Sequence, residues 1–249
     1  MSFDWIFFDC FNTLIDDFDQ TGEELALLPV YALPAQAGFY ASATEFRQDY
    51  HRWRNAQWQT DYREILMVDR YRAVLRARSP STEPEIITQL ALEMLHCFRQ
   101  CYQQSLRLPP GVQEMLEYWQ GRAQMGIVSN FYIEAWPAEL LAQFGLESYF
   151  KFVLDSSACG WRKPGQEIYQ LACQQAQVPE AERSRILFVG DHLENDVISP
   201  QSFGMQALYY DRSRERPTSS PAPDSILSIS HWQQFRCELW QGSNSEMVH

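Results

Sequence analysis

The sequence predicts an α/β protein whose doubly wound parallel sheet is interrupted by an inserted α-helical domain. Five short apolar runs have the length and composition of buried strands, and helical segments alternate with the later runs. Between the first and second runs lie more than 100 residues. That distance is far too long for one crossover connection, so it indicates an insertion.

The predicted strands are compact apolar runs without a clean alternation of apolar and polar residues. This pattern is typical of a parallel sheet that is covered on both faces. The strands comprise residues 5–10, 124–129, 150–155, 185–190 and 205–210. Two helices are predicted between the later strands. The first comprises residues 133–144 and ends before Gly145, and the second comprises residues 164–177, with Pro164 at its first helical position.

The insertion carries signals for helix starts and no clear strand run. Ser42–Glu45 and Thr82–Glu85 both match the capping box, in which a hydroxyl and a carboxylate satisfy the first backbone N–H groups of a helix. After the second box, apolar residues follow helical spacing. They are Ile87, Leu90, Ala91, Met94, Leu95, Phe98 and Tyr102.

We therefore expect two domains. Residues 17–108 form the helical domain, and residues 1–16 and 109–249 form the core, with Pro-Pro-Gly at 109–111 marking the return. A polar, Pro-rich loop is predicted over residues 212–225, and a frayed tail over the last eight residues.

Composition narrows the function classes. An apolar content of 45% is typical of a globular protein, and no apolar run reaches the length of a membrane span. The N-terminus lacks the basic flank of a signal peptide, so we expect a cytoplasmic protein. A net charge of −12 argues against nucleic acid as a partner, because phosphate binding needs a basic surface. A small-molecule substrate and a monomer or homodimer are expected instead.

The six cysteines show no metal-binding pattern. None forms a CxxC pair and no histidine cluster accompanies them, which argues against a zinc site. Cys97 and Cys101 lie four residues apart on a predicted helix, where we expect them to fill apolar space rather than form a bridge.

Polar residues stand at the ends of three predicted strands. Asp9 follows the first strand, Ser129 and Asn130 end the second, and Asp191 follows the fourth. Lys163 lies in the loop beyond the third. Ligands bind at the carboxyl ends of the strands in such sheets. Taken alone, an Asp or a Ser-Asn pair after a strand is ordinary turn chemistry, and a Lys before Pro is ordinarily a solvated side chain. The set in chain order, however, predicts a site.

Four stretches carry a family resemblance. FFDCFNTL, GIVSN, RKPGQEIY and VGDHLENDV resemble the four ordered motifs of the haloacid dehalogenase-like (HAD) hydrolase superfamily. The helical insertion lies where subfamily I of that superfamily has its cap. The resemblance therefore covers nearly the whole chain, and it implies a Rossmann-like core with a cap domain.

The resemblance also implies catalytic roles. Asp9 matches the nucleophile, which forms a covalent aspartyl intermediate. Thr13 and Ser129 match hydroxyl groups that hydrogen-bond to the transferred group, and Asn130 belongs to the same motif as Ser129. Lys163 matches the cation that neutralises the nucleophile and the developing negative charge.

A metal site is implied as well. Asp191 matches a Mg²⁺ ligand that acts together with Asp9 and with the backbone carbonyl of Phe11, while Asp196 matches a supporting acidic residue. Mg²⁺ prefers oxygen ligands and keeps several waters, so two carboxylates and one carbonyl suffice. The sequence thus predicts Mg²⁺ as the cofactor.

Phe11 departs from the pattern of the family's phosphatases, which have a second Asp at this position. That Asp protonates the leaving oxygen and then activates water, which is worth about 10²–10⁴ in rate. An aromatic residue at this position instead resembles the haloacid dehalogenases, whose halide leaving group needs no proton. Asn12 replaces a Gly, and Asn is among the few residues that tolerate a positive φ.

Three interpretations stay open. The favoured one is a Mg²⁺-dependent phosphatase of a small phosphorylated metabolite, with good leaving groups or a substitute acid such as His192 or a cap residue. The second is a metal-independent 2-haloacid dehalogenase-like hydrolase acting on a small organic acid. The third is a catalytically weak binding or regulatory module. Asp191 and Asp196 favour the first, because the dehalogenases usually carry a Ser-Asn type sequence in place of Gly190–Asp191.

Substrate choice is expected to depend on the cap. Its candidate residues are Arg52, Arg54, Trp58, Tyr62 and Arg63, and none of them can be assigned a role from the sequence. The acidic residues Asp16, Asp17 and Asp19 are expected to form a solvated turn rather than a second metal site.

Overall fold

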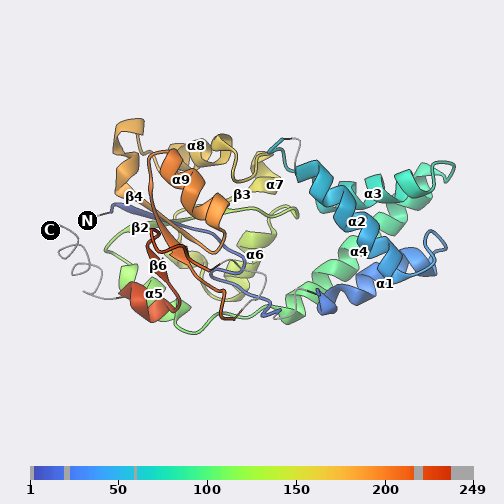
Figure 1. The fold of residues 1–249 in the computed structure, drawn as a ribbon, viewed down its shortest axis with the longest axis horizontal. Coiled ribbons are helices and arrows are strands. Elements are labelled where there is room, and N and C mark those ends of the chain that lie inside the picture. The colour runs from blue at the N-terminus through green and yellow to red at the C-terminus, as the bar shows by residue number, and fades with distance from the viewer. Residues whose placement is uncertain (1–2, 20–22, 59–60, 216–220, 237–249) are drawn as a thin grey trace.

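A computed structural model describes residues 3–19, 23–58, 61–215 and 221–236, and shows a sheet flanked by helices with a helical group at one end (Figure 1). All neighbouring strands run parallel, in the order β3-β2-β1-β4-β5-β6. Their bounds are Trp5–Phe8 (β1), Gln124–Ser129 (β2), Val153–Asp155 (β3), Ile186–Gly190 (β4), Gln206–Tyr210 (β5) and Ser228–Ile229 (β6). The predicted doubly wound fold is confirmed.

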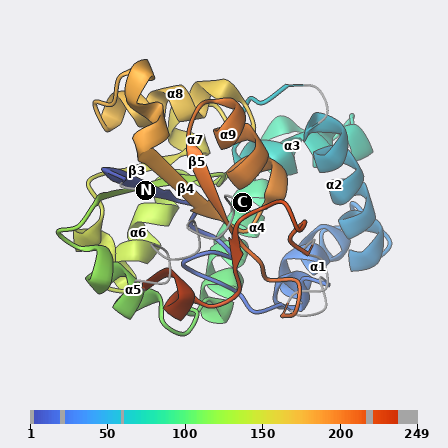
Figure 2. The same ribbon diagram turned by 60° about the vertical axis from the view of Figure 1, so that its left-hand side comes forward.

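The sheet separates two apolar layers, because successive side chains of a strand point to opposite faces. Ile6 and Phe8 of β1 pack with α5 (Val112–Trp119) and α6 (Trp136–Gln143). Phe7 packs on the other face, with α8 (Gln166–Gln175). Figure 2 shows α8 and α5 on opposite sides of the strands. Burial on both faces explains why the strands read as unbroken apolar runs.

Short helices complete the core. They are α7 (Ser156–Cys159), α9 (Ser199–Ser202), the 3₁₀ helices Glu147–Tyr149, Glu180–Arg185 and Trp232–Arg236, and a π-helical turn over Leu193–Ile198. Within the described residues, no helix has the length and apolar character that a membrane crossing needs.

Two predicted helix starts in the core were wrong. The helix predicted from residue 133 begins at Trp136, because Ala135 adopts a left-handed conformation (φ 60°) just before it. The helix predicted from Pro164 begins at Gln166. Gly165 donates its N–H to the Arg162 carbonyl, so Pro164 belongs to a turn and Gly165 is the N-cap residue.

Four helices of the segment between β1 and α5 pack together at the end of the sheet (Figure 1). They are α1 (Leu28–Gln36), α2 (Ala43–Trp58), α3 (Met67–Arg78) and α4 (Pro84–Ser105), preceded by the 3₁₀ helix Leu25–Leu27. The insertion is therefore helical, as predicted. In the apolar stripe of α4, five side chains are buried: Ile87, Leu90, Ala91, Met94 and Phe98. Leu95 and Tyr102 are partly buried and pack against the core.

One predicted capping box starts its helix, although its Glu accepts the N–H of the residue before Ser42, and the other is wrong. The Glu45 N–H donates to Ser42 Oγ (3.1 Å), and Glu45 Oε2 accepts the Ala41 N–H (2.9 Å). At α4 the N-cap residue is Glu83 rather than Thr82, and no side chain caps it. Pro84 takes the first helical position, where a missing N–H costs nothing. On α4, Cys97 and Cys101 carry unbridged thiols whose sulfur atoms lie 3.9 Å apart.

The segment after β1 contains a buried ion pair. The Asp16 carboxylate accepts from Arg212 Nη2, and both side chains are inaccessible to solvent. Arg212 Nη1 also donates to the Asn12 carbonyl (3.0 Å), so the loop after β5 holds the segment after β1 in place. The expectation that Asp16 lies in a solvated turn was wrong, because Arg212 compensates its charge. The predicted 212–225 loop lies partly outside the described residues, and the predicted tail lies wholly outside them.

Arg212→Met is expected to lower the free energy of unfolding by about 3–5 kcal/mol, because it leaves the buried Asp16 carboxylate unpaired. Urea denaturation followed by circular dichroism measures this loss. Arg214→Met, at an exposed position in the same loop, should change it by less than about 0.5 kcal/mol. Equal unfolding midpoints for the two variants would contradict the expected role of the pair.

Candidate active site

Asp9 stands one residue beyond β1, at the carboxyl edge of the sheet. Its backbone N–H donates to the Val189 carbonyl (2.9 Å), so the residue keeps the strand register although the strand has ended. Its side chain is almost buried. The apolar strand therefore places a carboxylate at the edge where β2 and β4 also end.

Lys163 meets that carboxylate from the loop after β3. Its Nζ donates to Asp9 Oδ1 and to Asp196 Oδ1, both at 2.7 Å, and the residue is only 1% exposed. Such burial of an ammonium group is tolerated when carboxylates pair with it. The two hydrogen bonds fix the ammonium group between the ends of β1 and β4.

Asn130 holds the backbone of Lys163. Its Nδ2 donates to the Lys163 carbonyl (2.8 Å), and its Oδ1 accepts the Lys163 N–H (2.7 Å). Both ends of the amide group are therefore engaged with the main chain of the lysine. We interpret Asn130 as a positioning residue rather than one that touches substrate.

Three carboxylates gather around this lysine. One ligand atom each of Asp9, Asp191 and Asp196 lies within 4.8 Å of the others. Thr13 Oγ1 lies 3.2 Å from Asp9 Oδ2 and 3.3 Å from Asp191 Oδ1, so its single proton can serve either. Asp196 is more fully engaged, because Oδ1 accepts from Lys163 and Oδ2 accepts the His192 N–H (2.9 Å).

Gly190 makes room for this arrangement. A Cβ at this position would lie 2.4 Å from Asp196 Oδ2, a distance that real Cβ atoms essentially never show. The Gly190–Asp191 pair of the fourth motif therefore has a steric reason as well as a chemical one.

Ser129 ends β2 beside these groups. It is fully buried, and its Oγ has no hydrogen-bond partner among the described residues. A buried polar group without a partner costs free energy. Ser129 lies at the end of β2 as the sequence predicts, and its role toward the transferred group stays a prediction.

The electrostatic balance of the site is negative. Burial raises the pKa of Asp9, and Asp196 adds to this rise while Lys163 opposes it. Burial acts to lower the pKa of Lys163, but Asp196 and Asp9 together raise it above its usual value. Lys163 is therefore held in its charged form, and one cation faces three carboxylates.

The donor set fits Mg²⁺. It consists of carboxylate oxygens, which are the ligands that this ion prefers. Asp9 and Asp191 are the better candidates, because Asp9 Oδ2 and Asp191 Oδ1 share one Thr13 hydroxyl proton, whereas the two oxygens of Asp196 accept from Lys163 and from the His192 backbone. The negative balance gives a divalent cation a favourable place.

Phe11 occupies the position where an acid was expected from the family pattern. Its ring stacks on Phe131, with the centroids 4.0 Å apart and an angle of 18° between the planes. Phe131 in turn stacks on Tyr132 at 4.6 Å. Asn12, the next residue, adopts φ 62°, which confirms that this position needs a left-handed conformation. The site thus has an aromatic wall at this position.

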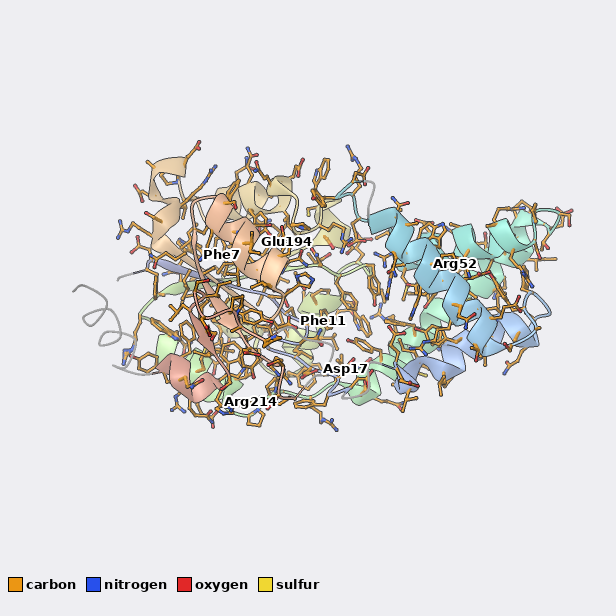
Figure 3. All side chains as sticks on the ribbon, viewed as in Figure 1. Phe7, Phe11, Asp17, Arg52, Glu194 and Arg214 are labelled. Atoms are coloured by element: carbon orange, nitrogen blue, oxygen red, sulfur yellow. The ribbon has the colours of Figure 1, made fainter. Side chains whose placement is uncertain are left out.

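A cavity of about 480 Å³ connects these groups. Figure 3 shows Phe11 at the end of the sheet that faces the four inserted helices. The cavity is lined by Asp9, Phe11, Asn12, Tyr62, Glu64, Arg70, Asn130, Tyr132, Arg162, Lys163, Pro164, Asp191, His192, Glu194, Asn195 and Asp196. Asp9, Asn130, Lys163, Asp191 and Asp196 are thus brought together, as the sequence predicts.

The cap residues singled out from the sequence lie in different places. Tyr62 lines the cavity, but Arg52 is mostly exposed and pairs with Asp49 on α2, away from Phe11 (Figure 3). Arg63 lies over the ring of Trp161 (4.3 Å), and Arg54 lies 3.8 Å from Glu24. The side chain of Trp58 lies outside the described residues.

Six lining residues were not singled out from the sequence: Glu64, Arg70, Tyr132, Arg162, Glu194 and Asn195. Arg162 directly precedes Lys163, and this adjacency is the one signal that could have found it.

Known proteins resemble this chain over most of its length. A family model described as haloacid dehalogenase-like hydrolase matches residues 3–204. Pyrimidine 5′-nucleotidase YjjG of Escherichia coli is 27% identical over 244 residues, which cover 96% of this chain and 100% of that protein. Phosphoglycolate phosphatase of Pseudomonas fluorescens is 27% identical over 161 residues, which cover 62% and 57% of the two chains.

Solved structures share the fold. A 2-haloacid dehalogenase from Pseudomonas syringae superimposes with a TM-score of 0.67 and 22% identity, covering 93% of this chain and 96% of that one. A phosphatase from Thermococcus onnurineus superimposes with a TM-score of 0.64 and 19% identity, covering 95% and 96% of the two chains. A phosphatase and a dehalogenase therefore share this architecture.

Proposed function

The chain belongs to the haloacid dehalogenase-like hydrolase family, and we propose that within this family it is a Mg²⁺-dependent phosphatase of a small phosphorylated metabolite. Two relatives, matched over 244 and 161 residues, are named pyrimidine 5′-nucleotidase and phosphoglycolate phosphatase. Both names describe the removal of phosphate from a small phosphorylated compound. These names support the class of reaction proposed here, and the individual substrates remain properties of those proteins.

The excess of carboxylates over cations carries this proposal. Asp9, Asp191 and Asp196 face one lysine, and this negative site repels a phosphate dianion unless another cation is bound. A hydrolase that attacks a neutral carbon–halogen bond has no need for the additional carboxylate of Asp191. Asp9 and Asp191, with the Phe11 carbonyl, would hold Mg²⁺, which when bound neutralises charge on the phosphoryl oxygens.

The chain's own residues supply the rest of the chemistry. An Asp9 carboxylate oxygen attacks phosphorus, so that a bond from this oxygen to phosphorus forms while the bond to the leaving oxygen breaks. Lys163, Ser129 and Thr13 hold the transferred group and disperse its charge. Water then cleaves the phosphoaspartate, which restores Asp9 and releases phosphate. Asn130 and Asp196 hold Lys163 in place.

The cap contributes enclosure. We propose that residues 17–108 act as a cap domain over the core of residues 1–16 and 109–249. Tyr62, Glu64 and Arg70 from this segment line the same cavity as Asp9. They can exclude water and contact the part of the substrate that is not transferred.

Phe11 supports a second candidate, a 2-haloacid dehalogenase-like hydrolase. Its stacked ring offers no proton, and a halide leaving group needs none. The structural similarity to a dehalogenase shows a shared fold and does not distinguish the two reactions.

A turnover screen with and without Mg²⁺ tests the choice. The panel comprises p-nitrophenyl phosphate, acyl phosphates, alkyl phosphates and 2-haloacids. We expect phosphate release that EDTA abolishes and added Mg²⁺ restores, because the carboxylate cluster repels the substrate without the ion. Halide release that persists in EDTA would contradict the phosphatase and support the dehalogenase. An absence of turnover on the whole panel would support a binding or regulatory module.

A further inference from the structure

A buried tyrosine that the proposed chemistry does not use lies beside the lysine site. Tyr169 stands on α8, in the same motif as Lys163, and is fully buried. Its ring packs edge-on against Phe188 of β4, with the centroids 5.8 Å apart, and Lys163 Nζ lies 5.1 Å from the centroid of the same Phe188 ring. A buried tyrosine hydroxyl needs a hydrogen-bond partner, and this partner distinguishes a packing role from a further one.

The hydroxyl of Tyr169 is bonded to the main chain of the fourth motif. It donates to the Asn195 carbonyl (2.5 Å), inside the π-helical turn Leu193–Ile198. Burial and the charge of Asp196 raise the pKa of Tyr169 above its usual value, while a hydrogen bond with Ser199 opposes the rise. The hydroxyl therefore stays protonated and serves as a donor.

The turn itself does not supply this donor. In a π-helical turn each carbonyl accepts from the N–H five residues later, and the Glu194 carbonyl accepts from the Ser199 N–H in this way. The equivalent donor for the Asn195 carbonyl would come from Pro200, which has no N–H. The N–H four residues later is that of Ser199, which is already engaged. Tyr169 thus provides, from α8, the hydrogen bond that the proline removes.

The residue that follows this carbonyl is Asp196, which binds the lysine. Its N–H donates to the His192 carbonyl (2.8 Å), and its two oxygens accept from Lys163 Nζ and from the His192 N–H. The side chain is only 1% exposed. All these bonds depend on the backbone of the turn, so a shift at Asn195 would move the carboxylate that holds Lys163.

We propose that Tyr169 is a positioning residue that holds Lys163 through the turn of the fourth motif. The lysine loop leads directly into α8, so the hydroxyl joins the segment that carries Lys163 to the turn whose Asp196 binds the ammonium group. The ammonium group is thereby fixed at the distance at which it meets Asp9. The kinetic consequences of this inference rest on the proposed function, whereas the position of the ammonium group does not.

Lysine-selective NMR tests the position without any turnover. The sequence contains two lysines, Lys151 and Lys163, and Lys151 is exposed whereas Lys163 is buried. Wild-type protein labelled with nitrogen-15 at lysine Nζ should show one ammonium signal that exchanges slowly with water, that of Lys163, because the exposed group exchanges too fast to be observed. Tyr169→Phe keeps the ring and loses the hydroxyl. We expect it to speed the exchange by about tenfold, the factor for a lost buried hydrogen bond.

Tyr71→Phe is the matched control. Tyr71 on α3 is as fully buried as Tyr169, but its hydroxyl has no hydrogen-bond partner among the described residues. The same substitution there removes no bond, so the exchange of the Lys163 signal should stay within about twofold of the wild type. Turnover should also stay within about twofold.

Kinetics with p-nitrophenyl phosphate at saturating Mg²⁺ provide a second readout. Tyr169→Phe should lower kcat by about 10–100-fold and change KM by less than about threefold, because Lys163 acts on charge that develops after binding. A double-mutant cycle identifies the route. Added to Asp196→Asn, Tyr169→Phe should lower kcat by less than a further twofold or so, since the hydroxyl acts through that carboxylate.

A rescue variant separates the hydrogen bond from general damage to the fold. Pro200→Ala restores an N–H that can donate to the Asn195 carbonyl in place of the hydroxyl. In the Tyr169→Phe background it should return kcat to within about threefold of the wild type. A double variant no more active than Tyr169→Phe would overturn the role assigned to this carbonyl.

The remaining outcomes distinguish the two proposals. A Tyr169→Phe protein with the ammonium signal and kcat of the wild type would overturn the positioning role and leave the phosphatase standing. Equal losses from Tyr169→Phe with and without Asp196→Asn would overturn the route through Asp196. Faster exchange of the Lys163 signal in Tyr169→Phe, in a protein whose wild type releases no phosphate from any ester, would support the positioning role and overturn the phosphatase.

Discussion

Asp9→Asn is expected to lower kcat/KM for phosphate-ester hydrolysis by about 10⁴–10⁶-fold, the scale seen when a covalent nucleophile is removed. The amide keeps the shape of the carboxylate but cannot attack phosphorus, and it removes one of the two negative charges that pair with Lys163. Initial rates with p-nitrophenyl phosphate at saturating Mg²⁺ measure the loss.

Asp4→Asn is the matched control. Asp4 lies at the opposite end of β1, partly exposed, and pairs with Arg185 on the surface. The same substitution there should leave the rate within about twofold of the wild type, because surface ion pairs contribute little. Acid-quench trapping with labelled phosphate should show a covalent adduct in the wild type and none in Asp9→Asn. An Asp9→Asn protein that keeps a tenth of the activity would contradict the covalent mechanism.

The sheet could be predicted because its strands are buried on both faces. Runs such as the one before Asp9 contain almost nothing but apolar residues, and a chain of this length buries them in only a few ways. The two-residue strand β6 could not be predicted, because it is held by pairing with β5 and has no apolar run of its own. The start of α8 also depended on a local contact, the turn from Arg162 to Gly165.

The catalytic edge of the site could be predicted for a topological reason. All strands of a parallel sheet end at the same edge. Residues that directly follow the strands, such as Asp9 and Asp191, therefore lie close together however the helices pack. The far wall of the cavity has no such rule. Glu64 and Arg70 reach it only because the segment before α3 pairs with residues 160–162, and a single sequence contains no sign of that pairing.

The roles of the cap candidates could not be predicted for the same reason. Arg52, Arg54 and Arg63 are equally plausible ligand-binding residues in the sequence, yet their side chains contact Asp49, Glu24 and Trp161 respectively. Which face of a helix meets the cavity depends on how the four helices pack against the sheet, and charge alone does not determine it.

Phe11→Asp is expected to raise kcat/KM for alkyl phosphates by about 10²–10⁴-fold, the contribution of a general acid. An alkoxide is a poor leaving group without a proton, and Phe11 cannot donate one. The residue lines the cavity next to Asp9, so a carboxyl group there is placed near the leaving oxygen. Turnover of p-nitrophenyl phosphate should change by less than about threefold, because its phenolate leaves without protonation.

Phe11→Asn is the control for this substitution, because it has the size of Asp and no acidic proton. Both variants lose the stacking on Phe131, and each should be less stable by about 3–5 kcal/mol, the usual cost of removing a large buried aromatic ring. The rates are therefore compared at a temperature at which both variants are folded. If Phe11→Asp and Phe11→Asn hydrolyse ethyl phosphate at the same rate, another residue already protonates the leaving oxygen. If only Phe11→Asp gains activity, the aromatic residue restricts the natural substrates to esters that leave as stable anions.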